Sequence, residues 1–261
     1  MPSFLQPLRR HRDLLLMLAW RDIRIKYKQS VMGFLWALLM PALIVSAGLV
    51  VKLGLASVSG RKLEMSQLAT VTLKALPWAF FVGSIRYATT SLTANTSLVT
   101  KVAFPRAVFP LAATLSALFD FAVASVVVLI VLIVAKVGVS VQLLWVPLLL
   151  VLLAAQTVGL TLLLSAANLF FRDVKYIVEI VMMFAIFFTP VFYEASMFGR
   201  WGTILMLNPV APILEGLMAA VVSHQAPDPM WTGYAAAWAV VLLTIGPLVF
   251  ARLEPMFAES I

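Results

Sequence analysis

The chain has 261 residues, of which 63% are apolar and only 11% are charged. Ordinary soluble domains are roughly 45–50% apolar and roughly 25% charged, so this composition excludes a soluble globular protein. The formal net charge of +8 does not indicate nucleic-acid binding, because the basic residues flank apolar runs and no basic domain stands apart from them. The absence of cysteine excludes disulfides and thiolate metal sites.

Residues 9–28 form the first stretch with a helical pattern. At about 100° per residue, basic side chains gather on one side of such a helix and apolar side chains lie beside them. A helix of this kind lies in the membrane interface, with its cations at anionic lipid headgroups, although any single cation is equally well explained as a topology signal. The candidate interface residues are Arg10, Arg21, Asp22, Arg24 and Lys28, and the apolar neighbours are Leu14, Leu15, Leu18 and Ile25.

Six apolar runs are long enough to cross a bilayer core, which needs about 20 residues of helix. They lie at about 33–52, 75–92, 108–135, 143–167, 174–192 and 234–251. Because lipid offers the backbone no hydrogen-bond partner, and these runs are too long for barrel strands, they predict an all-α bundle in a single transmembrane domain, 1–261. The span at 75–92 is the most polar, so we expect it to pack against protein rather than lipid.

A further apolar stretch, 205–222, is interrupted by Asn208, Pro209 and Pro212. These are too many helix breakers for a plain crossing, and a crossing here would place the C-terminus outside. We therefore expect re-entrant or interfacial helices on the outer side of the membrane.

The distribution of Lys and Arg predicts cytoplasmic N- and C-termini under the positive-inside rule. With that orientation the inner set is Arg9, Arg10, Arg12, Arg21, Arg24, Lys26, Lys28, Lys101, Arg106, Arg172, Lys175 and Arg252. The smaller outer set is Lys52, Arg61, Lys62, Lys74, Lys136 and Arg200, and Arg86 lies within a span.

Two ionisable residues at membrane depth are candidates for a functional role, because burying a charge in lipid is costly. Arg86 in the second span and Asp120 in the third lie at similar depth on antiparallel helices, which predicts an intramembrane charge pair. The pair has two interpretations, a structural link between helices or a polar lining of a translocation path. Glu179, near the inner end of the fifth span, is expected to be solvated or paired.

Motifs of catalysis are missing from the sequence. There is no G-x-x-x-x-G-K-[ST] loop to bind phosphates, so the chain is not expected to hydrolyse ATP itself. There is no H-E-x-x-H or G-x-S-x-G motif, and the acidic residues are scattered. We therefore predict a protein that is not an enzyme and binds no metal or cofactor.

The inner loop 94–106 is short and amphipathic and ends in Phe104-Pro105-Arg106. Proline fixes the angle at which the chain enters the third span. A compact helix exposed here offers a surface that a partner protein can push against.

Several motifs, in order along nearly the whole chain, resemble those of polysaccharide-exporting ABC transporter permeases, above all the O-antigen export permeases. They are WRDIRIKYKQS (20–30) followed by Gly33 and Trp36, LPWAFF (76–81), KVAFPR (101–106), FRDV (171–174), TPVFY (189–193), LNPVAP (207–212) and RLEP (252–255). Each motif is weak alone, whereas six or more in family order are specific.

The resemblance implies a permease in the bacterial inner membrane that forms a homodimer with two separate ATPase subunits, which carry ATP and Mg²⁺. A lipid-linked polysaccharide passes between the permeases. The stretch 95–104 resembles the coupling helix that docks on the ATPase, and its candidate contacts are Asn95, Thr96, Leu98, Lys101, Phe104, Pro105 and Arg106. Residues 171–174 match a short inner loop, and the stretch at Asn208-Pro209 matches outer helices that cap the channel.

Aromatic rings stack on the C–H faces of sugars, so an aromatic channel wall suits a glycan. The resemblance points to the first and fifth spans as that wall. The candidate rings are Trp36, Phe80, Phe81, Tyr87, Phe184, Phe187, Phe188, Phe192 and Tyr193. Two departures from the family are Arg86, where a small polar residue is usual, and Leu217-Met218, where many relatives carry an arginine after the glutamate matching Glu215.

Three other functions remain open. The same type of permease also exports capsule, teichoic acid or small amphiphiles. An ion-coupled secondary transporter needs a buried carboxylate, for which Asp120 is the one good candidate, and paired broken helices. A membrane transferase needs clustered acids or histidines at one interface.

Overall fold

The computed structural model describes residues 2–28, 65–101 and 104–258, together with scattered positions between 35 and 54. These residues form helices and no strand, and several of the helices are apolar and long enough to cross a membrane, which confirms the all-α membrane class. Most of the predicted first span, 33–52, lies outside the described residues, and so does Trp36.

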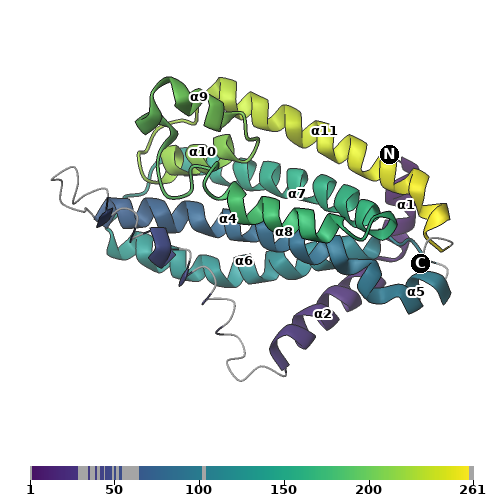
Figure 1. The fold of residues 1–261 in the computed structure, drawn as a ribbon. Helices are drawn as coiled ribbons and strands as arrows, with labels where there is room; N and C mark the ends of the chain where they lie inside the picture. The colour runs from purple at the N-terminus through teal and green to yellow at the C-terminus, as the bar shows by residue number, and fades with distance from the viewer. Residues whose placement is uncertain are drawn as a thin grey trace.

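Four long helices make up the body of the described part of the chain (Figure 1). They are α4 (Met65–Ser91), α6 (Val108–Val134), α7 (Trp145–Phe170) and α11 (Pro229–Leu253). Each is long and apolar enough to be a membrane span, and they overlap the predicted spans at 75–92, 108–135, 143–167 and 234–251, although α4 begins ten residues before its predicted span. In α4, 72% of the most apolar window is buried, against 17% in α6, so the polar helix does pack against protein.

The short elements connect and flank these four. The α-helices are α1 (Pro2–Arg10), α2 (Arg12–Lys28), α5 (Thr96–Lys101), α8 (Val174–Ala185), α9 (Arg200–Met206) and α10 (Ala211–Val221). The 3₁₀ turns are η1 (Thr93–Asn95), η2 (Val141–Leu144), η3 (Ala195–Phe198) and η4 (Glu254–Ala258). Helix α5 lies at one end of the bundle, and α9 and α10 lie at the other (Figure 1); we name these the α5 end and the α9 end.

The predicted helix 9–28 is formed by α1 and α2, which are separated by His11. Leu18 is buried and Leu14 and Leu15 pack beside it, as the pattern indicated. Ile25 lies on the same side of the helix, two turns beyond Leu18, but is 67% exposed. The last turns of α2 contact α6 through Lys26 and Tyr27, which both bond to Asp120.

Helix α8 is shorter than the predicted span at 174–192, because it ends at Ala185 and continues as turns. Twelve residues of helix reach only about 18 Å at 1.5 Å per residue, less than a bilayer core. Pro190 lacks a backbone N–H and disfavours helical geometry at Thr189, which explains why the helix cannot continue through this stretch.

Helices α9 and α10 meet at a bend of 109°. The bend lies at residues 207–210, where Asn208 and Pro209 were expected to interrupt the apolar stretch. Both helices lie at the α9 end, where α11 begins (Figure 1). A bend of this size fits a broken span as well as a re-entrant loop, so the re-entrant segment remains a prediction.

Candidate functional site

A cavity of about 760 Å³ lies between α4, α6 and α8. Its walls are largely apolar, with aromatic rings from α4 and α6; the rings of Phe80 and Phe121 lie 5.6 Å apart. Four charged side chains also reach it, namely Lys26, Arg86, Asp120 and Glu179. The cavity therefore combines apolar rings with paired charges, a surface suited to an amphiphilic ligand.

The predicted pair between Arg86 and Asp120 is not formed. Arg86 binds Glu179 of α8 instead, with 2.8 Å between Nη2 and Oε2. The two side chains are 41% and 55% exposed, which agrees with the expectation that Glu179 is solvated or paired. The sequence analysis failed here because α8 packs beside α4, and that neighbour supplies a carboxylate nearer to the guanidinium.

Asp120 is bound by the interface segment, a contact that the sequence analysis missed. Lys26 and Tyr27 of α2 both donate to its carboxylate, and Lys26 also lies 4.7 Å from the centre of the Tyr87 ring. Burial, reinforced by the Asp120 carboxylate, raises the pKa of the Tyr27 phenol. Tyr27 therefore keeps its proton and remains a donor. No signal within α2 alone singles out Lys26 from the other cations.

The two ion pairs are expected to differ in their effect on stability. Asp120→Asn should lower the free energy of unfolding by about 1–3 kcal/mol, because a part-buried acceptor of two donors loses its charge. Glu179→Gln should change it by less than about 1 kcal/mol, since that pair is exposed. Thermal unfolding of the purified protein in detergent compares the two, and equal effects would contradict the assignment of Asp120 as the anchor of α2.

The described members of the predicted aromatic set fall into four groups. Tyr87 and Phe80 line the cavity. Phe81 and Phe192 are buried in the main core. Phe184, Phe187 and Phe188 are each more than half exposed. Tyr193 is held at the turn that follows, where its hydroxyl donates to the carbonyl of Phe187 at 2.7 Å.

The predicted coupling segment forms η1 and α5, at the α5 end. Val99 is buried and Leu98 half-buried, whereas Thr96 and Ser97 are exposed. Asn95 is half-buried, and its Nδ2 donates to the carbonyl of Ser91 at 2.8 Å. The side chain of Lys101 lies outside the described residues. The helix thus rests its apolar side on the bundle and leaves a polar side free within the described part of the chain.

Phe104 and Arg106 belong to the base of this segment rather than to its free side. The Phe104 ring packs 5.5 Å from that of Phe109 at the start of α6. Arg106 donates from Nε to the carbonyl of Val99 (3.1 Å) and from Nη1 to the carbonyl of Glu254 (2.7 Å). Pro105, between them, is half-buried.

The predicted inner loop 171–174 lies beside the coupling segment. Asn168, at the end of α7, accepts from the backbone N–H of Lys175 (3.0 Å) and donates to Thr93 (3.4 Å). A cavity of about 380 Å³ separates the two segments, with Arg172 at its edge. Two segments about 75 residues apart in sequence thus form one surface at the α5 end.

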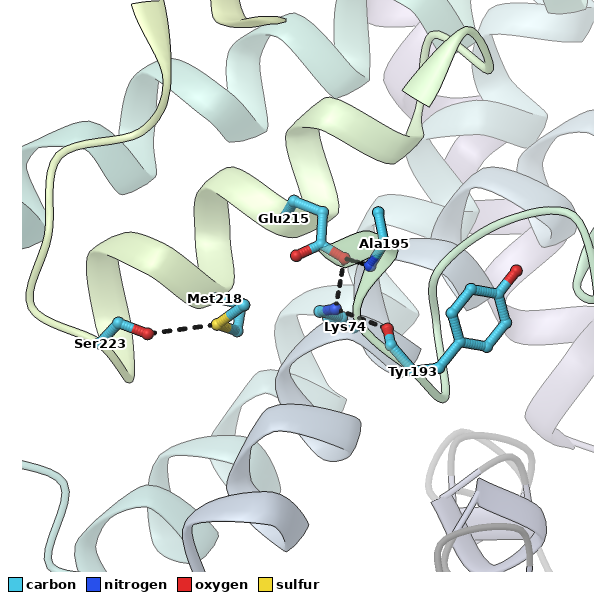
Figure 2. A network of polar contacts seen from close by, with 6 residues as sticks. All are labelled: Lys74, Tyr193, Ala195, Glu215, Met218 and Ser223. Atoms are coloured by element: carbon cyan, nitrogen blue, oxygen red, sulfur yellow. Dashed lines mark hydrogen bonds and ion pairs between the residues drawn. The ribbon is translucent and has the colours of Figure 1, made fainter. Parts of the chain in front are cut away.

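A buried ion pair at the α9 end was also missed (Figure 2). Lys74 has a fully buried side chain and binds Glu215 of α10, with 2.9 Å between Nζ and Oε1. Its Nζ also donates to the carbonyl of Tyr193 (3.0 Å), and Oε1 of Glu215 accepts from the N–H of Ala195 (3.0 Å). Lys74 was assigned to an outer loop, although the absence of Gly and Pro from residues 65–74 indicated that the helix begins earlier.

Among the described residues, no group of three or more His, Asp or Glu side chains is arranged to hold a metal ion.

Comparison with known proteins agrees with this architecture. The chain is 28% identical to the O-antigen export system permease protein RfbA of Klebsiella pneumoniae, over 95% of this chain and 94% of that protein. It is also 28% identical to the O-antigen export system permease protein RfbA of Myxococcus xanthus, over the full length of both. Residues 13–222 match the family described as ABC-2 type transporter. The chain therefore belongs to the ABC-2 type transporter family.

Proposed function

We propose that this chain is the permease subunit of an ATP-driven exporter that moves lipid-linked O-antigen, or a similar long polysaccharide, across the bacterial inner membrane. The choice of substrate rests on the end-to-end similarity to two permeases named for O-antigen export. The chain itself performs no covalent chemistry in this function.

The proposed partners are an ATPase subunit and a second copy of this chain. Membership of the ABC-2 type transporter family supports a separate ATPase subunit that binds ATP and Mg²⁺, which agrees with the lack of a phosphate-binding loop in this sequence; two copies are part of the proposal. Two copies of this chain enclose the path of the glycan. The positive-inside bias supports a cytoplasmic location for both termini, and therefore for the α5 end, where both termini lie.

The mechanism is mechanical. The ATPases bind the exposed side of α5 and move it when they close on ATP. Because α5 is continuous with α4 through η1 and rests on the first turns of α6, its displacement tilts both helices. The exposed rings Phe184, Phe187 and Phe188 offer flat apolar faces on which successive sugars stack weakly and slide.

Deletion of the gene tests the function. Surface polysaccharide and lipid-linked intermediates at the inner leaflet are measured in the deletion strain and after restoration with the wild-type copy. We expect loss of surface glycan, with full-length lipid-linked chains accumulating inside. Unchanged surface glycan would reject the export of that polymer, and chains that are never made would indicate a role in synthesis.

Complementation with Ser97→Arg tests the docking of the ATPase on α5. Ser97 is exposed, so the substitution should leave the fold intact while a bulky cation blocks the partner, reducing export about tenfold or more, the effect of about 1.4 kcal/mol on binding. Ser223→Arg, also exposed but at the α9 end, is the matched control and should restore export. Equal export by both variants would reject α5 as the docking helix.

Asp120→Asn separates this function from ion-coupled transport. A carrier driven by protons needs a titrating carboxylate at membrane depth and is inactivated by the amide. The permease proposed here uses Asp120 to hold α2, so the folded Asp120→Asn variant should still export. Complete loss of export by a folded variant would favour the ion-coupled alternative.

A further inference from the structure

The first observation is a clamp between the end of α5 and the end of α11. Arg106 donates from Nε to the carbonyl of Val99, in the last turn of α5. The same residue binds Glu254 twice: its backbone N–H donates to Oε1 (2.6 Å), and its Nη1 donates to the backbone carbonyl (2.7 Å). Glu254 follows directly on α11. One side chain therefore fastens α5 to the beginning of η4, with charge-assisted bonds.

The clamp is set in a packed cluster of aromatic rings. Phe257 of η4 is fully buried, and its ring lies 5.1 Å from that of Phe250 and 5.8 Å from that of Phe170. These rings belong to η4, α11 and α7. Packed interiors have low compressibility, so a displacement of α5 is passed on to α11 rather than absorbed at this junction.

Helix α11 then spans the bundle from end to end. Its 25 residues reach about 37 Å, and it lies against α7 along this length (Figure 1). Midway, Gly246 approaches the backbone of Gly159 so closely that neither position has room for a Cβ. Pro247, the next residue, leaves one backbone hydrogen bond of α11 unmade and is buried. The two helices are therefore held together as one unit.

The other end of α11 is fastened to the bend between α9 and α10. The hydroxyl of Tyr234 donates to the carbonyl of Leu207 (2.6 Å), the residue that directly follows α9. Gln156 of α7 donates both to the carbonyl of Pro209 in the bend (3.3 Å) and to that of Ala235 in α11 (2.9 Å). The bend is thus bonded to the same α7–α11 unit that the Arg106 clamp holds at the α5 end.

We infer that α11 mechanically couples the two ends of the transporter. When α5 moves, the bonds between Arg106 and Glu254 move α11, and the bond from Tyr234 to Leu207 moves the α9–α10 bend. Glu254 and Tyr234 are positioning residues, since neither touches substrate or ATPase in this assignment. The inference rests on the proposed function, and it names the route by which the ATPase side controls the far end of the path.

The test uses the complete transporter, this permease with its ATPase partner, in proteoliposomes loaded with the lipid-linked glycan. ATP hydrolysis and glycan export are measured together. Tyr234→Phe removes only the hydroxyl, at the end far from the ATPase. We expect ATP hydrolysis within about twofold of wild type and export per ATP reduced about fivefold, the change in population that one lost hydrogen bond produces. Tyr176→Phe, at an exposed tyrosine of α8, is the matched control and should export normally.

Glu254 supplies the second half of the test. Glu254→Ala should lower export per ATP, as Tyr234→Phe does. Glu254→Gln keeps an acceptor for the Arg106 N–H, so its export per ATP should lie between those of Glu254→Ala and wild type. The Glu254→Ala/Tyr234→Phe double variant should be no worse than the more severe single one, because both break one route.

The outcomes separate the two proposals. Wild-type transporter that exports no glycan would reject the proposed function. If wild type exports, three results would each overturn the role of α11. The first is wild-type export per ATP in both single variants, and the second is a loss of ATP hydrolysis that parallels the loss of export. The third is a loss of export per ATP in the double variant that equals the product of the two single losses.

Discussion

Lys74→Met is expected to destabilise the protein by about 3–5 kcal/mol, because it leaves the Glu215 carboxylate in the bundle without its partner. The lysine side chain is fully buried and that of Glu215 is 15% exposed, so water can replace little of the lost interaction. The carbonyl of Tyr193 also loses a donor. Thermal unfolding in detergent, at one pH and protein concentration, measures the loss.

The Lys74→Met/Glu215→Leu double variant is the control. It removes both charges, and replacing a whole buried pair by apolar residues is often close to neutral. Some loss should persist, since the N–H of Ala195 and the carbonyl of Tyr193 keep no partner in this network. The double variant should therefore be more stable than Lys74→Met alone. A double variant that is less stable would show that the two side chains do not compensate each other's charge.

The same pair has a place in the function. It joins α4, which continues into η1 and α5, to α10 beside the bend. A folded double variant that exports poorly would mean that this link positions the α9 end, and normal export would assign the pair to stability alone.

Gly159→Ala is the second substitution with a large expected effect. A Cβ at this position collides with the backbone carbonyl of Leu242 in α11, which cannot move aside as a flexible side chain can. Overpacking of this kind costs about 1–3 kcal/mol or forces the helices apart. We expect a lower unfolding temperature, and reduced export because α7 and α11 no longer hold each other.

Gly233→Ala is the matched control, since the same methyl group meets no atom within 4 Å there. Alanine favours helix over glycine by about 1 kcal/mol, so this variant should be as stable as wild type or slightly more so. Unfolding temperatures of the two variants, measured side by side, test whether the close approach of α7 and α11 excludes a Cβ at Gly159. Equal stability would show that α7 and α11 do not approach as closely as described.

The sequence by itself determined the membrane class, four helices that are long and apolar enough to cross a bilayer, and the break at Asn208-Pro209. Hydropathy over 20 residues and the backbone chemistry of proline are local properties, so they need no knowledge of neighbours. The interruption at Asn208-Pro209 is an example, because the bend in the structure falls at these residues. Thr189-Pro190 carried the same signal for the end of α8 and was overlooked in the prediction.

The tertiary structure alone decided which charges pair. Arg86 and Asp120 were correctly identified as unusual, but each binds another partner, Glu179 and Lys26 respectively. Lys74 was assigned to a loop, and its pairing with Glu215 joins residues 141 positions apart. The physical reason is that the helical period shows which side chains share a face, but not how far a helix is rotated or which helix lies beside it. Those two quantities are fixed by the packing of the whole bundle, and they set every interhelical contact of this protein.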